Sequence, residues 1–439
     1  MQLTLQAFND GSWQDAYRLK IEQPTLGKQG WISAQALTQY AVSYFDETGS
    51  RSFSVSYPVN PMDVHTFPNW PALIEDIMPM GYARTIWLDM LGLQQESVAM
   101  QDVTLLKMGT IAPIGNLRIK ESVEHALSQQ VAELAQLRFA KQMVIDRDHD
   151  FLNYARQRGA VSGGATGAGG AAPKLLVRLS KQQQVWIDPQ QDDNSDDLHY
   201  LVKFPRGNTA IDKDILRAEY HFYAELAELG FDTMQIKRLH LHEGITNPSL
   251  WLPRFDREYS GGKVLRFGVE SIFSLLNKPA GSHLKHEDVL SALVKVVNTQ
   301  TVAELTAEYL QRDLLNLVFG NSDNHGRNMA ILKKDNHISL APIYDFAPMK
   351  ADPEVVIRTT HWSTHFERSG DIAWLPLCES LAEYGEPSYL FLQLQQLAEK
   401  VRHLPQRLAK RGVPDSILSM PVMGFTYLEQ RLQNWGLLT

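Results

Sequence analysis

The chain has 439 residues, 44% hydrophobic and 21% charged, which is enough to bury roughly two or three cores of ordinary globular composition. A formal net charge of −8 gives no general attraction for nucleic acid. Cys378 is the one cysteine in the sequence, so an intrachain disulfide and a thiolate zinc cluster are excluded.

The first residues lack a basic region followed by an apolar core, so they do not resemble a signal peptide. No apolar run approaches the length that spans a bilayer. We therefore expect a cytoplasmic protein with no membrane partner.

Residues 1–121 predict a small mixed domain, with alternating strand-like segments and two short helices separated at Pro79. Residues 122–158 then carry apolar side chains at helical spacing. This periodicity predicts one long amphipathic helix that bridges the first domain and the next.

Residues 122–256 predict a second, β-rich part that includes this helix. After the bridging helix come three strand-like runs. A second helix then follows, from about Asp212 to Gly230, and carries Glu219. Two more strand-like runs follow, at 234–243 and 250–257. The first three runs are residues 175–180, 184–189 and 199–205.

Residues 257–439 predict a mainly helical third part, from about residue 270 onward. A β-rich part followed by a helical part is typical of the α+β class.

A glycine-rich run, 161-VSGGATGAGGAAPK-174, precedes the first of these strands. Such a run can lay backbone N–H groups against phosphates. It matches neither of the common glycine-rich nucleotide motifs, so a flexible linker stays as the alternative.

Lys203 lies in the middle of the apolar strand YLVKFP. A buried ammonium needs a partner, and either a nucleotide phosphate or Glu219 would supply one. The alternative is a lysine on an edge strand that points to water.

Asp323 and Asn328 stand five positions apart in GNSDNHGRN, after a helical run. Phosphoryl transfer uses such a pair, a carboxylate that orients the attacking hydroxyl and an amide oxygen that holds Mg²⁺. Asp345 follows at the end of a predicted strand, ISLAPIYD, and would be the main metal ligand. The alternative is that Asp323 merely closes a turn.

The order of these motifs, from glycine loop to metal aspartate, recurs in protein kinases. The chain resembles the HipA-type serine/threonine kinases of bacterial toxin–antitoxin systems. The resemblance is carried by GAGGAAPKLLV, YLVKFP, AEYHFYAELAELG, WLPRFDRE, FGNSDNHGRNMAIL and LAPIYDFAP, and it is strong over residues 160–350.

This resemblance implies a bilobal protein-kinase-like fold related to the phosphoinositide kinases, with a β-rich N-lobe, a helical C-lobe and a small N-terminal subdomain. It makes Asp323 the catalytic base, and it makes Asn328 and Asp345 the Mg²⁺ ligands. The residues expected to bind ATP are Lys203, Arg254 and Phe255 at the hinge, Asp256 near the ribose, and Gly167, Gly169 and Gly170.

The resemblance further implies an ATP- and Mg²⁺-dependent toxin that phosphorylates itself and a protein substrate, for which an aminoacyl-tRNA synthetase is a family example. A helix-turn-helix antitoxin would be the partner, and DNA would be reached only through it. Two alternatives stay open: a catalytically weak corepressor that acts with a DNA-bound antitoxin, and a lipid or small-molecule kinase.

The chain departs from the family in the glycine-rich loop, where many members carry a serine whose autophosphorylation switches the enzyme off. Thr166 is the closest hydroxyl here, and Ser162 lies further upstream. These two residues are the candidate autophosphorylation sites.

Overall fold

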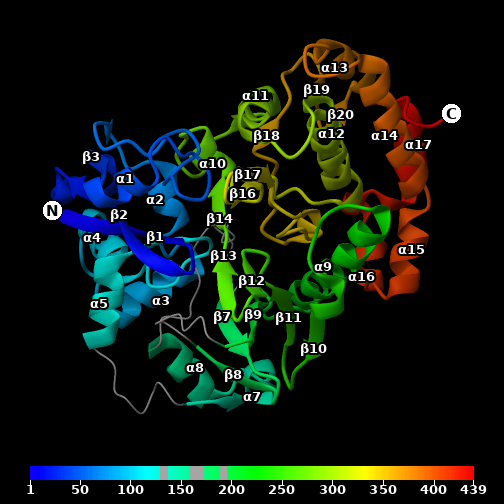
Figure 1. Cartoon of the computed structure of the whole chain (residues 1–439). Coiled ribbons are helices and arrows are strands. Elements are labelled where there is room, and N and C mark those ends of the chain that lie inside the picture. Colours follow the sequence, from blue (N-terminus) through cyan, green and yellow to red (C-terminus); the bar gives the residue numbers. More distant parts are fainter. Residues whose placement is uncertain (129–136, 158–172, 188–194) are drawn as a thin grey trace.

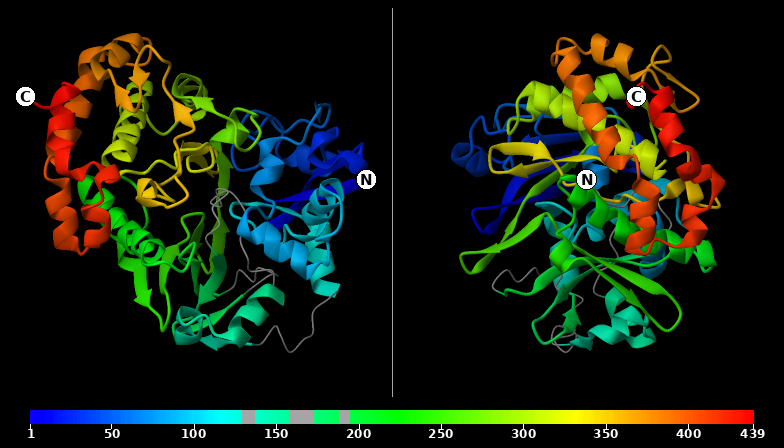
Figure 2. Two further views of the ribbon diagram at one scale, coloured as in Figure 1. Left: turned by 180° about the vertical axis from the view of Figure 1, so that it is seen from behind. Right: turned by 90° about the vertical axis from the view of Figure 1, so that its right-hand side faces the viewer.

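The computed structural model describes residues 1–128, 137–157, 173–187 and 195–439. Among these residues, helices and strands are mixed along the chain, and the buried apolar side chains form three clusters. The N-terminal sheet and the C-terminal helices lie on opposite sides of the molecule, as the front and back views agree (Figures 1 and 2).

The N-terminal part is built on an antiparallel sheet with strand order β4-β3-β2-β1-β5. Asp10 and Gly11 both have positive φ and connect β1 to β2 as a two-residue hairpin turn, for which Asp-Gly is a preferred pair. The strands are β1 (Gln2–Asn9), β2 (Ser12–Ile21), β3 (Ile32–Ala36), β4 (Val64–Phe67) and β5 (Leu117–Ile119).

Short helices cover this sheet and close its own apolar cluster. Two of them, α2 and α3, lie on either side of Pro79, so the predicted pair of short helices is confirmed. The helices are η1 (Pro24–Gln29), α1 (Thr38–Ser43), α2 (Ala72–Asp76), α3 (Tyr82–Met90), α4 (Val98–Met108) and α5 (Lys120–Ser128).

A second antiparallel sheet follows, with strand order β10-β11-β9-β7-β8-β6 in the described residues. The predicted strands before and after α9 are present as β7, β8, β9, β10 and β11. The strands are β6 (Phe139–Ala140), β7 (Lys174–Leu179), β8 (Gln184–Trp186), β9 (Leu198–Lys203), β10 (His240–Glu243) and β11 (Pro248–Pro253).

Helix α9 (Ala210–Leu229) packs against β11 and carries Glu219, as predicted. Thr209 and Asp212 form a reciprocal capping box at its start, which satisfies backbone N–H groups that the helix leaves unpaired. Gly230 ends it in the left-handed conformation. Smaller elements near this sheet are α7 (Lys141–Ile145), α8 (His149–Gln157), η2 (Ile236–Arg238), β12 (Arg257–Ser260) and β13 (Lys263–Arg266).

The C-terminal part is mainly helical but also contains a sheet of order β14-β16-β17. Each of these strands has four or five residues, too few for a clear period, so the sequence did not predict β14 and β16. The strands of this part are β14 (Gly268–Ser271), β15 (Leu284–Lys285), β16 (Ala330–Lys334), β17 (His337–Leu340), β18 (Thr360–His361), β19 (Glu367–Arg368) and β20 (Asp371–Ile372).

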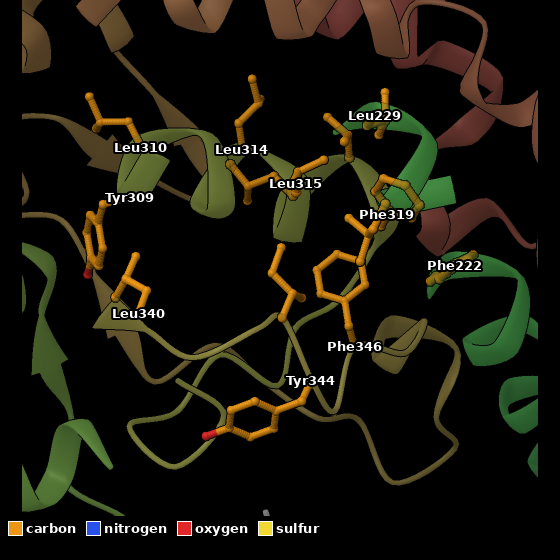
Figure 3. Packing of buried hydrophobic residues seen from close by; sticks show 14 of the residues in the cluster. Phe222, Leu229, Tyr309, Leu310, Leu314, Leu315, Phe319, Leu340, Tyr344 and Phe346 are labelled. Carbon is orange, nitrogen blue, oxygen red and sulfur yellow. The ribbon is translucent and has the colours of Figure 1, made fainter. Parts of the chain in front are cut away.

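Helix α12 (Val302–Phe319) is buried along much of its length and packs against α9 through the Phe222–Phe319 ring contact (Figure 3). Phe346 packs on both rings and thereby fixes the segment just after Asp345. The other helices are α10 (Ile272–Leu275), α11 (His286–Val296), η3 (Met349–Ala351), α13 (Trp374–Ser380), α14 (Pro387–Val401), α15 (Leu404–Arg411), α16 (Asp415–Leu418), η4 (Pro421–Met423), η5 (Phe425–Tyr427) and α17 (Leu428–Asn434).

The single long helix predicted over residues 122–158 is wrong. Phe139 pairs with Val185 as part of β6, so pairing with the sheet edge overrides helical periodicity there. Arg147 has positive φ, which interrupts a helix at this point, and the Asp148 carboxylate accepts the N–H of Asp150. The chain therefore begins a separate helix, α8.

The strand predicted to end in Asp345 also ends earlier, at Leu340. Pro342 has no N–H to donate to a neighbouring strand, which explains why regular pairing stops. Ile343 then forms only an isolated bridge with Thr233. Asp345 therefore lies in a loop. Among the described residues, no helix combines the length and apolar character needed to cross a membrane.

Candidate active site

Lys203 lies on β9 in the interior of the second sheet and does not point to water. Its side chain is almost fully buried, and Nζ donates to both carboxylate oxygens of Glu219 at 2.7 and 2.8 Å. Burial opposes its charge, but Asp345 and Glu219 outweigh this effect and raise the pKa of Lys203 above its ordinary value. Lys203 is therefore a fixed positive charge.

Asp345 accepts hydrogen bonds from two lysines. Lys203 Nζ lies 2.5 Å from Oδ1, and Lys174 Nζ lies 3.2 Å from Oδ2. Burial would raise the pKa of Asp345, but the two lysines outweigh it and hold this pKa well below the ordinary range. Asp345 also has a positive φ of 51°, an uncommon conformation for a residue with a side chain.

Lys174 is a site residue that sequence reasoning missed. It starts β7 directly opposite Lys203 on β9, so the register of the two strands brings both ammonium groups to one place. The feature of the sequence that could have identified it is a lysine placed between the glycine-rich run and an apolar strand. Its side chain is 6% exposed, a burial that a lysine tolerates only when paired.

The loop of residues 321–328 begins where Gly320 ends α12 in the left-handed conformation. Asn321 Oδ1 accepts the N–H of Asp323, and Asn328 Nδ2 donates to the carbonyl of Asp323 at 2.8 Å. The turn is thus closed by amide side chains. The carboxylate of Asp323 faces His325 instead, with Oδ1 3.4 Å from Nε2.

His325 is held in one tautomer by its surroundings. Its Nδ1 accepts the N–H of Arg327 at 3.1 Å, so the remaining proton lies on Nε2 and faces Asp323. Burial lowers the pKa of His325 and favours this neutral form. The ring therefore orients the Asp323 carboxylate.

Asn328 Oδ1 is buried and has no hydrogen-bond partner within the described residues. A buried acceptor without a partner points to a group that binds there, such as a water or a cation. In the described residues, no three His, Cys, Asp or Glu side chains gather as a metal site. Mg²⁺ commonly takes one or two protein ligands and completes its shell with phosphates and water, and the amide oxygen of Asn328 and the carboxylate of Asp345 are of the donor types that it accepts.

A cavity with about 1030 Å³ of empty space, part of it open to solvent, lies beside Asp323 and Asp345. Asp323, His325 and Asp345 line it together with the two lysines and Glu219. A smaller pocket of about 400 Å³ shares Lys174, Lys203 and Asp345. Its other walls are mainly apolar and include Leu201, Met234, Leu252, Pro253, Phe255 and Tyr344.

Arg254, Phe255 and Asp256 all lie on the wall of this smaller pocket, directly after β11. Phe255 packs on Tyr344 with ring centroids 5.5 Å apart. The Asp256 carboxylate accepts hydrogen bonds from Arg254, Arg257 and the N–H of Gly115, and it is almost fully buried. These bonds make Asp256 a support of the pocket wall. Gly167, Gly169, Gly170, Thr166 and Ser162 lie outside the described residues.

Comparison with known proteins identifies the family of this chain. The family of the HipA-like C-terminal domain matches residues 166–410, and because this is more than half of the chain, the protein belongs to that family. The predicted resemblance to HipA-type proteins is confirmed. No curated protein sequence matches the chain significantly.

A solved structure from Shewanella oneidensis MR-1, the toxin–antitoxin system HipA, HipB and its operator DNA complex, is similar over 98% of this chain and 97% of that chain. The identity is 14% and the TM-score 0.63, so the fold is shared. The Helicobacter pylori proinflammatory kinase CtkA matches 54% of this chain and 85% of its own, with 15% identity and a TM-score of 0.34.

Proposed function

We propose that this protein is an ATP- and Mg²⁺-dependent serine/threonine protein kinase with a bilobal, kinase-like arrangement around the shared cavity. One observation carries the proposal. Two buried lysines and the carboxylate of Asp345 meet in a cavity that also holds Asp323 and His325. Positive charge, a metal-type carboxylate and an oriented base are the groups that phosphoryl transfer requires.

Each residue has a distinct role in this proposal. The apolar pocket beside Pro253 and Phe255 would take the adenine, and Lys203 and Lys174 would face the phosphates. Asn328 and Asp345 would hold Mg²⁺, which supplies positive charge that neutralises the phosphates. Asp323, oriented by His325, would accept the hydrogen bond of the incoming hydroxyl.

The same proposal extends to partners. The Shewanella relative was solved with HipB and operator DNA, which supports a comparable antitoxin for this chain and contact with DNA through it. The proposal also includes a toxin role, with a cellular protein as substrate and itself as a second substrate, and this part is supported by membership of the HipA-like family.

Labelled ATP tests the proposal. Purified protein is incubated with Mg²⁺ and γ-labelled ATP, alone and with cell extract, beside the Asp323→Gln variant and a sample with chelator. Label should enter protein in the wild type and in neither control. ATP binding without transfer to any protein would favour the corepressor alternative, and label in lipid or small molecules would favour the other kinase alternative.

A further inference from the structure

Arg327 lies inside the 321–328 loop, one position before Asn328, and its guanidinium is buried. The side chain is 3% exposed. Nε lies 3.2 Å from Asp76 Oδ1, and Nη2 lies 3.4 Å from Glu75 Oε2. Both carboxylates belong to the N-terminal part, so the loop reaches across to a segment 251 positions away.

The receiving segment is itself fixed. Asp76 ends α2 and is 2% exposed, and its second oxygen accepts the N–H of Ser271 at 3.2 Å. Glu75 also contacts Lys28 at 3.3 Å. The two carboxylates are therefore anchored before they meet Arg327, which suits them to hold a loop in place.

The backbone of Arg327 is tied to the proposed reaction groups on both sides. Its N–H donates to His325 Nδ1, the contact that turns the other ring nitrogen toward Asp323. Its carbonyl accepts the Tyr344 hydroxyl at 2.6 Å, and Tyr344 directly precedes Asp345. A shift of Arg327 would therefore move His325, Asn328 and the Tyr344 contact together.

From this geometry we infer that Asp76 and Glu75 of the N-terminal part are positioning residues for phosphoryl transfer, acting through Arg327. Among the described residues, neither carboxylate lines the main cavity or contacts Lys174 or Lys203, so the two act on the placement of Asp323 and Asn328. The inference rests on the proposed function, and it gives the N-terminal part a role in the rate of the reaction.

Steady-state kinetics of Asp76→Asn and Arg327→Met test it. Each variant should lower kcat by about 10- to 100-fold, since misplacing reacting groups by a fraction of an ångström to an ångström has this effect. ATP affinity, measured by calorimetry, should stay within about two-fold of wild type, because the lysines and the base pocket are untouched.

Further variants separate positioning from simple loss of structure. Arg327→Lys keeps one charged donor and should recover part of kcat. The double variant Asp76→Asn with Arg327→Met should be no slower than Arg327→Met alone, because both changes break one connection. Asp76→Asn is nearly isosteric and carries the test if Arg327→Met does not fold.

Glu270→Gln is the matched control. Glu270 is another fully buried carboxylate at the same boundary and accepts hydrogen bonds from Ser54 Oγ at 2.6 Å and Val55 N–H at 3.1 Å. It makes no hydrogen bond to the 321–328 loop among the described residues. Its variant should keep kcat near wild type.

Hydrogen exchange provides a readout that does not need activity. Amide exchange within residues 321–328 should be faster in Asp76→Asn and unchanged in Glu270→Gln. If the wild type transfers no phosphate, the proposed kinase fails, while faster exchange still supports the anchoring itself. Wild-type kcat in a folded Asp76→Asn, a loss confined to ATP affinity, or an equal loss in Glu270→Gln would overturn the inference.

Discussion

Asp345 and Asp323 both face the main cavity, but at the scale of single residues they make different contacts. Asp345 is held by two lysines, whereas Asp323 faces only the oriented ring of His325 among its described side-chain contacts. The proposed roles therefore predict different losses when each is replaced.

Replacing Asp345 should remove the response to Mg²⁺ and ATP. Asp345→Asn keeps the shape of the side chain but loses the charge that holds the cation. In the wild type, ligand at about 100 times its Kd adds about 2.7 kcal/mol to the free energy of unfolding. Thermal melting with and without ATP and Mg²⁺ measures this gain. An equal rise in variant and wild type would refute the metal assignment.

Acid should destabilise the wild type partly through Asp345. Because its folded pKa lies below the ordinary value of 3.8, its charge adds stability above that pH, and this is lost as pH falls through the lowered value. Asp345→Asn should therefore lose less unfolding free energy between neutral pH and about pH 3 in urea titrations. Asp150→Asn, at a side chain that is 84% exposed, should follow the wild type.

Replacing Asp323 should spare nucleotide binding and slow transfer. Asp323→Gln removes the base but leaves both lysines and Asp345 in place, so ATP affinity should hold. Transfer should fall by about 10²- to 10⁴-fold, the usual contribution of a positioned base. Growth arrest at the wild-type level by this variant would remove Asp323 from the mechanism and would favour the corepressor alternative.

At the scale of elements, two helices that support the site end in the same way. Gly230 ends α9 with φ 96°, and Gly320 ends α12 with φ 69°. A Cβ on Gly230 would meet no atom within 4 Å, whereas one on Gly320 would lie 2.4 Å from Cε of the buried Met423. A side chain would therefore strain the backbone at both positions, but only at Gly320 would its Cβ also lack room.

Alanine at each position tests this difference. Gly230→Ala should lower the free energy of unfolding by about 1–2 kcal/mol, the cost of a left-handed residue with a side chain. Gly320→Ala should cost more, because Met423 must also move, and it should disturb the loop that carries Asp323. Urea unfolding of both variants measures the order. Equal losses would show that Met423 gives way freely.

At the scale of the whole molecule, buried charged contacts join the N-terminal part to the rest. Glu270 accepts from Ser54, Asp256 accepts the N–H of Gly115, and Arg327 contacts Asp76. Separating the parts would break the buried ion pair of Arg327 with Asp76 and would remove hydrogen-bond donors from the buried carboxylates of Glu270 and Asp256, which is strongly unfavourable.

The parts should therefore unfold together. Urea transitions followed by far-UV circular dichroism and by tryptophan fluorescence should coincide, because tryptophans are present in both parts. Removal of residues 1–121 should prevent the remainder from folding cooperatively. Two separate transitions in the full chain, or a cooperative fold of the shortened chain, would contradict this prediction.

Patterns within single segments of the sequence were enough to predict the family and most of the helices and strands around the site. The helix that ends at Gly230 was predictable because a capping box, an apolar stripe and a terminal glycine all act within one segment. The spacing of Asp323 and Asn328 and the position of Lys203 in an apolar strand are likewise features of single segments, so they could be predicted too. The long helix over residues 122–158 failed because Phe139 pairs with a strand that is distant in sequence.

Only the tertiary structure decided which groups meet. Lys174 and Lys203 come together through strand register, and neither spacing nor periodicity states that register. Arg327 finds Asp76 at a separation of 251 positions, and each residue alone reads as an ordinary surface charge. Periodicity reports the neighbours of a residue along its own element. Burial and pairing of charges depend on contacts between elements, and these exist only once the chain has packed.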